Sequence, residues 1–274
     1  MNKTLCTILA ICILNSCKKE EFNIENLNGN RITAMGHAGM GIGSSYPMNS
    51  CESILKCLHV GMDGSEFDVQ MTKDSVLVAY HDQDLSDHTN LNGQINSFSW
   101  DEIKFAHYTQ TAYLDYSIVS LEQLFSSIEN VQNYKFTFDC KLYPSTGNIE
   151  QYYESYINAI IRTIQNHHIE NNVYFESQSV QFLEMFKRKW PESKLFIYPP
   201  SFQAGLEIAL SKGLYGITIS TRDITKEQIK LSHDNNLLVA IWNTHTKSEN
   251  IEAIKKNPDF IQTDEVKSLK KLLR

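Results

Sequence analysis

The sequence predicts an α/β fold in which eight parallel strands and the helices between them close into one (β/α)8 barrel. Short β-rich runs alternate with amphipathic helical windows along the chain, which is typical of a parallel sheet covered by helices. These runs number eight, as closure of such a barrel requires. The length of 274 residues suits one barrel and a short leader, and no repeat of solenoid or propeller period is present.

The expected strands are runs of β-branched and aromatic residues bounded by turn residues. They cover residues 32–37, 65–70, 135–141, 173–177, 195–198, 216–220, 238–242 and 259–263. Helices are expected where apolar residues recur at helical period and a stop signal follows. Such windows are residues 50–58, which end near Gly61, 180–189 before Pro191, 202–212 at Gly213, and 225–236.

One further β-rich run, residues 76–81, cannot be a parallel strand. Only residues 71–75 separate it from the second strand, and a parallel crossover needs a dozen or more residues. It is therefore predicted to form a hairpin. A two-residue turn at Lys73-Asp74 would place His81 opposite Glu66, and a looser turn would shift this pairing by about one place. The insertion that follows, residues 82–134, is expected to cap the barrel mouth.

Alternation along the strands separates polar from apolar side chains. On the second strand Phe67 and Val69 would face the helices, and on the third strand Phe136 and Phe138 would do the same. The opposite faces then point into the barrel, and catalytic residues gather where barrel strands end. The side chains expected at this mouth are His37, Glu66, Asp68, His81, Asp139 and Lys141, and Trp242 is expected to line the substrate pocket.

This set of side chains predicts metal-assisted phosphoryl transfer. Three carboxylates cannot all stay charged in a half-buried mouth without a cation, because like charges raise each other's pKa. Oxygen ligands without a thiolate favour one divalent cation, Ca²⁺ or Mg²⁺. Two histidines supply an acid and a base at neutral pH, and a lysine offers a fixed charge to an anionic substrate.

Composition supports an ordinary globular protein and argues against a nucleic-acid partner. Hydrophobic residues make up 42% of the chain and aromatic residues 11%, which provides for a large core and excludes a disordered or fibrous protein. Lys and Arg number 25 against 32 Asp and Glu, giving a net charge of −7. Such an acidic balance does not suit a surface that tracks a phosphate backbone.

At the predicted mouth the sequence resembles the glycerophosphodiester phosphodiesterase family of TIM-barrel enzymes. The matching stretches are Gly36-His37-Ala38-Gly39, Pro47-Met48-Asn49-Ser50, Glu66-Phe67-Asp68 with Thr72-Lys73-Asp74, His81-Asp82, and Asp139-Cys140-Lys141. Weaker similarity continues through the later strands to Ile261-Gln262-Thr263-Asp264. The resemblance implies a metal-dependent phosphodiesterase that releases glycerol 3-phosphate and an alcohol.

The resemblance also implies a role for each site residue. His37 and His81 would be the catalytic acid and base, and Lys141 would contact the phosphate. The metal ligands would be Glu66, Asp68 and Asp139.

Three positions depart from the family pattern. Ala38 stands where the family has an arginine, Met48 replaces a glutamate, and Asp87 falls where a later arginine would lie. Losing guanidinium contacts weakens phosphate binding unless another cation compensates. Asp139 in place of the usual glutamate is similar to the sphingomyelinase D branch, which has the same barrel.

Two alternative functions therefore stay open. One is a phospholipase D-like, sphingomyelinase D-type enzyme acting on lysolipids or phospholipids, and the other is a surface lipoprotein that binds phosphodiesters without turnover. For the phosphodiesterase itself, deacylated head-group diesters, teichoic-type polymers and lysolipids remain candidate substrates.

The first residues are predicted to direct export. Residues 1–16 carry a basic start and an apolar run too short to span a bilayer, as in a signal peptide. Leu14-Asn15-Ser16-Cys17 resembles a bacterial lipoprotein box, and the charged residues 18–21 resemble a surface-display tag. Residues 17–30 would be a lipidated tether and 31–274 the barrel, anchored by lipid on Cys17 to the outer membrane on its periplasmic or cell-surface face. Cleavage near Ser16 to give a simple secreted protein is the alternative.

Overall fold

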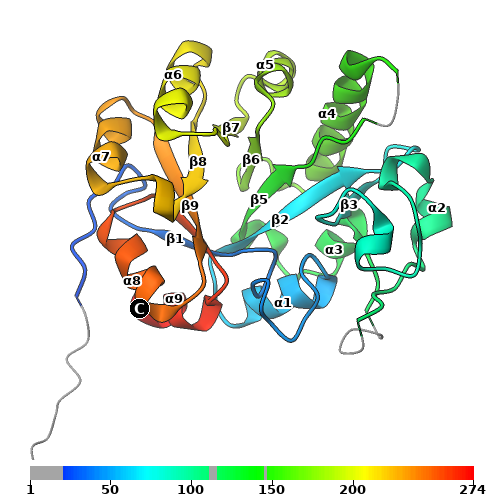
Figure 1. Ribbon diagram of the computed structural model, residues 1–274, viewed down its shortest axis with the longest axis horizontal. Coiled ribbons are helices and arrows are strands. Elements are labelled where there is room, and N and C mark those ends of the chain that lie inside the picture. The colour runs from blue at the N-terminus through cyan, green and yellow to red at the C-terminus, as the bar shows by residue number, and fades with distance from the viewer. Residues whose placement is uncertain (1–20, 111–115, 145–146) are drawn as a thin grey trace, which may run out of the picture.

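A computed structural model describes residues 21–110, 116–144 and 147–274 and confirms the predicted barrel (Figure 1). Eight parallel strands follow one another around it, and β1 pairs with both β10 and β2, which closes the sheet. The barrel strands are β1 (Thr33–Gly36), β2 (Gly64–Met71), β5 (Lys135–Cys140), β6 (Val173–Ser177), β7 (Lys194–Ile197), β8 (Gly216–Ser220), β9 (Leu238–Thr244) and β10 (Phe260–Thr263).

Helices surround the barrel and begin at capping residues that the sequence supplies. They are α1 (Cys51–His59), α3 (Leu121–Ser126), α4 (Ile149–Asn166), α5 (Val180–Lys189), α6 (Phe202–Lys212), α7 (Lys226–Asp234), α8 (Lys247–Lys255) and α9 (Val266–Leu272). Ser50 and Ser179, for example, accept a backbone N–H of the first turn of α1 and α5. Gly213 ends α6 in the left-handed conformation, as its sequence position predicts. Among the described residues no helix is both long and apolar enough to cross a bilayer.

Strand alternation sorts the core into two parts, as predicted. The outward faces of β2 and β5 bury Phe67, Phe136 and Phe138 against the helices, where Phe125 of α3 lies 5.1 Å from Phe136 between ring centres. Inside the barrel a separate cluster fills the lower part and consists of Met35, Tyr174, Phe196, Ala240 and Phe260. Because this apolar floor fills the lower part of the barrel interior, the polar side chains that point inward lie at the C-terminal end of the barrel.

The hairpin exists, and it has the looser turn that the sequence allowed, so its register is shifted by one place from that of a two-residue turn. Strand β3 (Leu77–Ala79) runs antiparallel to β2 with Val69 opposite Ala79. The turn has three residues rather than two, since Thr72 N donates to Val76 O at 2.9 Å and Ser75 takes a positive φ of 63°. Asp68 O accordingly accepts the N–H of Tyr80, so His81 aligns with Phe67 rather than with Glu66.

The insertion has a core of its own and is shorter than the predicted residues 82–134. Its short helices are α2 (Trp100–Ile103) and the 3-10 turns Leu85–Asp87 and Ile95–Ser97. Their apolar side chains cluster with Tyr80 and Ile118, apart from the barrel core. The chain then returns to the barrel, because β4 (Val119–Ser120) pairs with β3 and α3 packs into the main core. Further 3-10 turns are Val131–Asn133 and Thr221–Asp223.

The described part of the expected tether is bound to the barrel. Asn26 Nδ2 donates to Pro258 O at 2.8 Å, and Asn28 N donates to Asp259 Oδ1 at 3.0 Å. Both acceptors precede β10, so this segment lies at the end opposite the mouth. The predicted signal peptide and Cys17 lie outside the described residues.

Phe125→Ala should lower the free energy of unfolding by about 3–5 kcal/mol, because it opens a cavity among buried rings. Chemical denaturation measures this loss. The matched control is Phe105→Ala at a side chain that is 79% exposed, where we expect a change within about 0.5 kcal/mol. Equal losses in the two variants would contradict the placement of α3 in the barrel core.

Candidate active site

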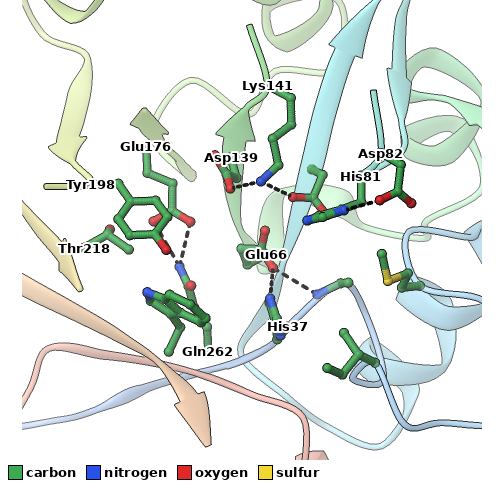
Figure 2. Close-up of a pocket in the computed structure, with 15 residues that line it drawn as sticks. His37, Glu66, His81, Asp82, Asp139, Lys141, Glu176, Tyr198, Thr218 and Gln262 are labelled. Carbon is green, nitrogen blue, oxygen red and sulfur yellow. Dashed lines mark hydrogen bonds and ion pairs between the residues drawn. The ribbon is translucent and has the colours of Figure 1, made fainter. Parts of the chain in front are cut away.

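All seven predicted site residues line one cavity of about 360 Å³ at the mouth of the barrel (Figure 2). They come from five segments: the end of β1, the inner face of β2, the end of β3, the end of β5, and β9. The residues are His37, Glu66, Asp68, His81, Asp139, Lys141 and Trp242. The structure thus brings together every residue that the sequence placed here.

His37 is held in one orientation by Asp264. Its Nδ1 lies 2.8 Å from Asp264 Oδ1, and its Nε2 points toward Glu66 Oε2 at 4.0 Å. Burial by itself would lower the pKa of His37, but the hydrogen bond to Asp264 and the charges of Glu66, Asp264 and Asp68 outweigh it and raise the pKa to about 9. The Nδ1–H is therefore committed to Asp264, and Nε2 is the atom that faces the site.

The three acidic residues form a set that fits a divalent cation. One carboxylate oxygen each from Glu66, Asp68 and Asp139 lies within 4.8 Å of the others. Burial, with the charges of Asp68, Glu176 and Asp139, raises the pKa of Glu66 well above its usual range. Such mutual repulsion in a buried site is relieved when a cation binds, and an all-oxygen donor set suits Ca²⁺ or Mg²⁺.

Lys141 balances part of this charge. Its Nζ lies 3.0 Å from Asp68 Oδ1 and 2.7 Å from Asp139 Oδ2. Burial alone would raise the pKa of Asp68, yet Lys141 and the neighbouring histidines lower it. The pKa of Asp139 is raised instead, because burial prevails there. The lysine therefore lies between two candidate metal ligands, with one-fifth of its side chain exposed.

Two backbone positions with positive φ hold the carboxylates. Ala38 (φ 49°) donates its N–H to Glu66 Oε2 at 2.9 Å. Asn49 (φ 64°) donates Nδ2–H to Asp68 Oδ2 at 2.7 Å and accepts the N–H of Asp68 at 3.0 Å. Sequence reasoning quoted both residues within motifs but gave neither this role. Asparagine tolerates the left-handed region, which is the signal that could have marked Asn49.

His81 lies at the rim of the cavity, with 45% of its side chain exposed. Its Nδ1 lies 3.0 Å from Asp82 Oδ1, and the other oxygen of Asp82 lies 3.1 Å from His88 Nε2. Asp264 is shared in the same way, since its second oxygen lies 2.5 Å from His245 Nδ1. Both mouth histidines thus use a carboxylate that also contacts a second histidine.

Sequence reasoning missed Glu176 and the partners of the two histidines. Glu176 lines the cavity, is 3% exposed, and accepts from Gln262 Nε2. Alternation along β6 with Phe175 facing outward would have placed it inside the barrel. The contact between His37 and Asp264 joins residues 227 positions apart, and only closure of the barrel reveals it.

The fold and the site define a class of protein: a parallel (β/α)8 barrel with an acidic, histidine-flanked cavity at its C-terminal mouth. A family model described as the glycerophosphoryl diester phosphodiesterase family matches residues 40–268. The chain belongs to this family, as the resemblance implied. That family places the chain among the phosphoric diester hydrolases.

Curated relatives and solved structures agree with this assignment. A glycerophosphodiester phosphodiesterase of Bacillus altitudinis is 26% identical over 83% of this chain and 93% of the relative. A protein of the same name from Caldanaerobacter subterraneus subsp. tengcongensis is 24% identical over 86% and 96%.

Among solved structures, an Oleispira antarctica phosphodiesterase in complex with the product sn-glycerol-3-phosphate has a TM-score of 0.76 at 18% identity, covering 89% of this chain and 97% of its own. A glycerophosphodiester phosphodiesterase from Parabacteroides distasonis has a TM-score of 0.72 at 20% identity, covering 89% and 98%. At these identities the structural likeness establishes the shared barrel.

Asp264→Asn should destabilise the metal-free protein within a defined pH range. The ion pair between Asp264 and His37 contributes fully to the free energy of unfolding between the ordinary aspartate pKa of 3.8 and the ordinary histidine pKa of 6.5. This contribution is lost as the pH rises through about 9, where His37 loses its proton, or falls below 3.8, where Asp264 gains one. Urea unfolding in EDTA should therefore show a loss on the order of 2 kcal/mol between pH 4 and 6.5 that shrinks on both sides.

The control for this experiment is Asp234→Asn, which breaks an exposed pair with Lys230 on α7. We expect a loss below about 1 kcal/mol there. A loss in Asp264→Asn that does not change with pH would contradict the assigned pairing with His37.

Proposed function

We propose that this chain is a metal-dependent phosphodiesterase that hydrolyses glycerophosphodiesters to glycerol 3-phosphate and an alcohol. The observation that carries the proposal is the convergence of two histidines, three carboxylates and one lysine on a single cavity in a member of this family. A structural neighbour captured with sn-glycerol-3-phosphate as its product supports this choice of product.

Glu66, Asp68 and Asp139 would hold one divalent cation, Ca²⁺ or Mg²⁺, which as a Lewis acid stabilises charge that develops on the phosphate oxygens. The chain prepares this set before any ion binds. The N–H of Ala38 orients Glu66, and the amide of Asn49 orients Asp68. With these two contacts fixed, neither carboxylate has to be reoriented when the ion arrives.

His37 and His81 would move the two protons of the reaction. One imidazole takes the proton of the attacking oxygen, and the other delivers a proton to the oxygen of the leaving alcohol. In each histidine Nδ1 is bound to an aspartate, Asp264 or Asp82, which leaves Nε2 to exchange the proton. Hydrolysis consumes one water in total, whether it attacks phosphorus directly or resolves a product formed by a glycerol hydroxyl.

Lys141 and Trp242 would bind the substrate. Lys141 Nζ supplies the positive charge that Ala38, in the place of the family arginine, does not. Trp242 Nε1 is buried and lacks a hydrogen-bond partner among the described residues. A ligand oxygen would satisfy that N–H, and a buried donor without a partner is costly. These two donors are our candidates for compensating the missing guanidinium.

The phospholipase D-like activity remains a second candidate because part of the cavity wall is apolar. Ala38 and Met48 line it where the family has charged residues, and Ile42 beside them is 51% exposed. An exposed apolar side chain at a mouth suits an acyl chain. The two activities differ in product, because the alternative releases a cyclic phosphate from a lipid rather than glycerol 3-phosphate and a free alcohol.

Purified residues 18–274 should release glycerol 3-phosphate from glycerophosphodiesters with Ca²⁺ or Mg²⁺, and EDTA should abolish the release. His37→Ala should lower kcat by about 10²–10⁴-fold, since it removes a proton-transfer group. His59→Ala, at an exposed position at the end of α1, is the matched control and should leave kcat unchanged. Turnover that survives EDTA or His37→Ala would contradict this mechanism, and metal binding without turnover of any diester or lysolipid would favour the binding protein.

We also propose that lipid on Cys17 anchors the chain to the outer membrane, a proposal supported only by the sequence of residues 14–17. In bacteria that express the full chain, labelled palmitate should enter the wild type and not Cys17→Ala, and the variant should leave the membrane fraction. Ser16→Ala, which keeps the cysteine, serves as the control. Equal labelling of wild type and Cys17→Ala would exclude the anchor.

A further inference from the structure

The carboxylate that orients His37 is buried, and only one of its two oxygens is hydrogen-bonded. Asp264 Oδ1 accepts the backbone N–H of Ile42 at 3.0 Å and lies 2.8 Å from His37 Nδ1. Asp264 Oδ2 is buried as well, and it forms no hydrogen bond within the part of the chain that the structure describes. Burial of a carboxylate oxygen is costly unless an opposite charge or a hydrogen bond compensates it.

His245 lies against this second oxygen. Its Nδ1 is 2.5 Å from Asp264 Oδ2. The other side of the ring is held by Asn243, whose Oδ1 lies 2.5 Å from His245 Nε2. The Nδ2 of Asn243 donates to Ser220 Oγ at 3.3 Å, so the amide oxygen is the atom that faces the ring. The imidazole of His245 is therefore held between two oxygens, and its protonated form pairs with Asp264.

A bulge in β9 brings His245 to this position. Strand β9 has one residue more than its partner β10 between the paired positions Ile241–Ile261 and Thr244–Thr263. Within this stretch Asn243 takes a positive φ of 70°. Just beyond the strand, the backbone N–H of His245 donates to Glu249 Oε2 at 2.7 Å. Bulges redirect side chains and are frequent beside active sites, and this one directs His245 toward Asp264.

His245 does not line the catalytic cavity. It lines a second cavity of about 480 Å³, which Asp264 also lines. The charge of His245 nevertheless affects the site. Burial would raise the pKa of Asp264, but the contact with His37, the N–H of Ile42 and the charge of His245 together lower it. His245 can therefore act on a substrate in the catalytic cavity only through Asp264.

We propose that His245 is a positioning residue that holds His37 through Asp264. Its contact with Oδ2 keeps the carboxylate turned so that Oδ1 faces His37 Nδ1, and His37 Nε2 then stays directed into the catalytic cavity. When His245 is removed, the carboxylate is free to turn and the ring of His37 loses its fixed orientation. This inference rests on the proposed phosphodiesterase function, in which His37 transfers a proton.

The kinetic test compares His245→Ala with His245→Asn. We expect His245→Ala to lower kcat about tenfold and to leave KM within about twofold, because His245 contacts no substrate. The amide nitrogen of His245→Asn takes roughly the place of Nδ1 and can donate to Asp264 Oδ2, so this variant should recover most of the lost kcat. Since 37% of the His245 side chain is exposed, we expect both variants to fold.

The matched control is Lys247→Ala, at an exposed position where α8 begins, and it should keep the wild-type kcat. An unchanged kcat in His245→Ala would overturn the positioning role, as would an equal loss in His245→Asn. A raised KM with unchanged kcat would also overturn it, because that result places His245 in contact with the substrate.

Failure of the proposed function gives a different result, namely no turnover by the wild type. Positioning is then measured by NMR on the metal-free protein, from the Nδ1–H proton of His37, which is assigned by its absence from His37→Ala. This proton should be protected from exchange with water in the wild type and in His245→Asn, and it should exchange at least tenfold faster in His245→Ala. Equal exchange in the wild type and His245→Ala, or an unprotected proton in the wild type, would overturn the inference.

Discussion

Charge balance among buried carboxylates is the constraint on which this structure depends. Glu66, Asp68, Asp139 and Glu176 lie on three adjacent strands and face one cavity. No such group is stable unless a hydrogen bond or an opposite charge compensates its burial. The compensating groups differ among the four carboxylates. Glu66 has a backbone N–H and the nearby His37, Asp68 has an asparagine and Lys141, and Asp139 has Lys141. Glu176 has two neutral partners, the amide of Gln262 and the hydroxyl of Thr218.

The barrel makes this crowding possible. Direct pairing of Asp68 with Asp139, and of Asp139 with Glu176, places three acids at one level of the sheet. Below them the apolar floor around Tyr174 and Phe260 excludes water, with ring centres 4.7 Å apart. A site with a dry floor and one open end strengthens every electrostatic contact above it. It also restricts substrate to a single approach, from the side where His81 and the insertion lie.

Much of this architecture could be predicted because it follows from local rules. Alternation of Phe67 with Glu66 and Asp68 assigns the inner face of β2 from sequence alone. The sequence could not decide between the two hairpin registers, since the choice depends on Ser75 adopting a left-handed backbone conformation. Serine has no particular preference for that conformation. The end of the insertion could not be predicted either. Apolar residues such as Leu121 and Phe125 can pack on the insertion or on the barrel core, and the sequence pattern is the same in both cases. The contact between Asp264 and His37 forms only when the barrel closes, so no local sequence pattern predicts it.

Two of the departures from the expected family pattern, Ala38 and Met48, fall where the backbone rather than the side chain makes the contact. Ala38 holds Glu66 through its N–H, and Met48 contributes its carbonyl to the hydroxyl of Tyr108 at 3.2 Å. Any residue that tolerates the local φ supplies the same groups, so both side chains were free to change without disturbing the carboxylates. The cavity wall is apolar at Ala38 and Met48, and the carboxylates, the histidines and Lys141 line the same cavity. Under the proposed function, the polar set would carry out transfer of the phosphoryl group, and the apolar wall at Ala38 and Met48 would contact the alcohol.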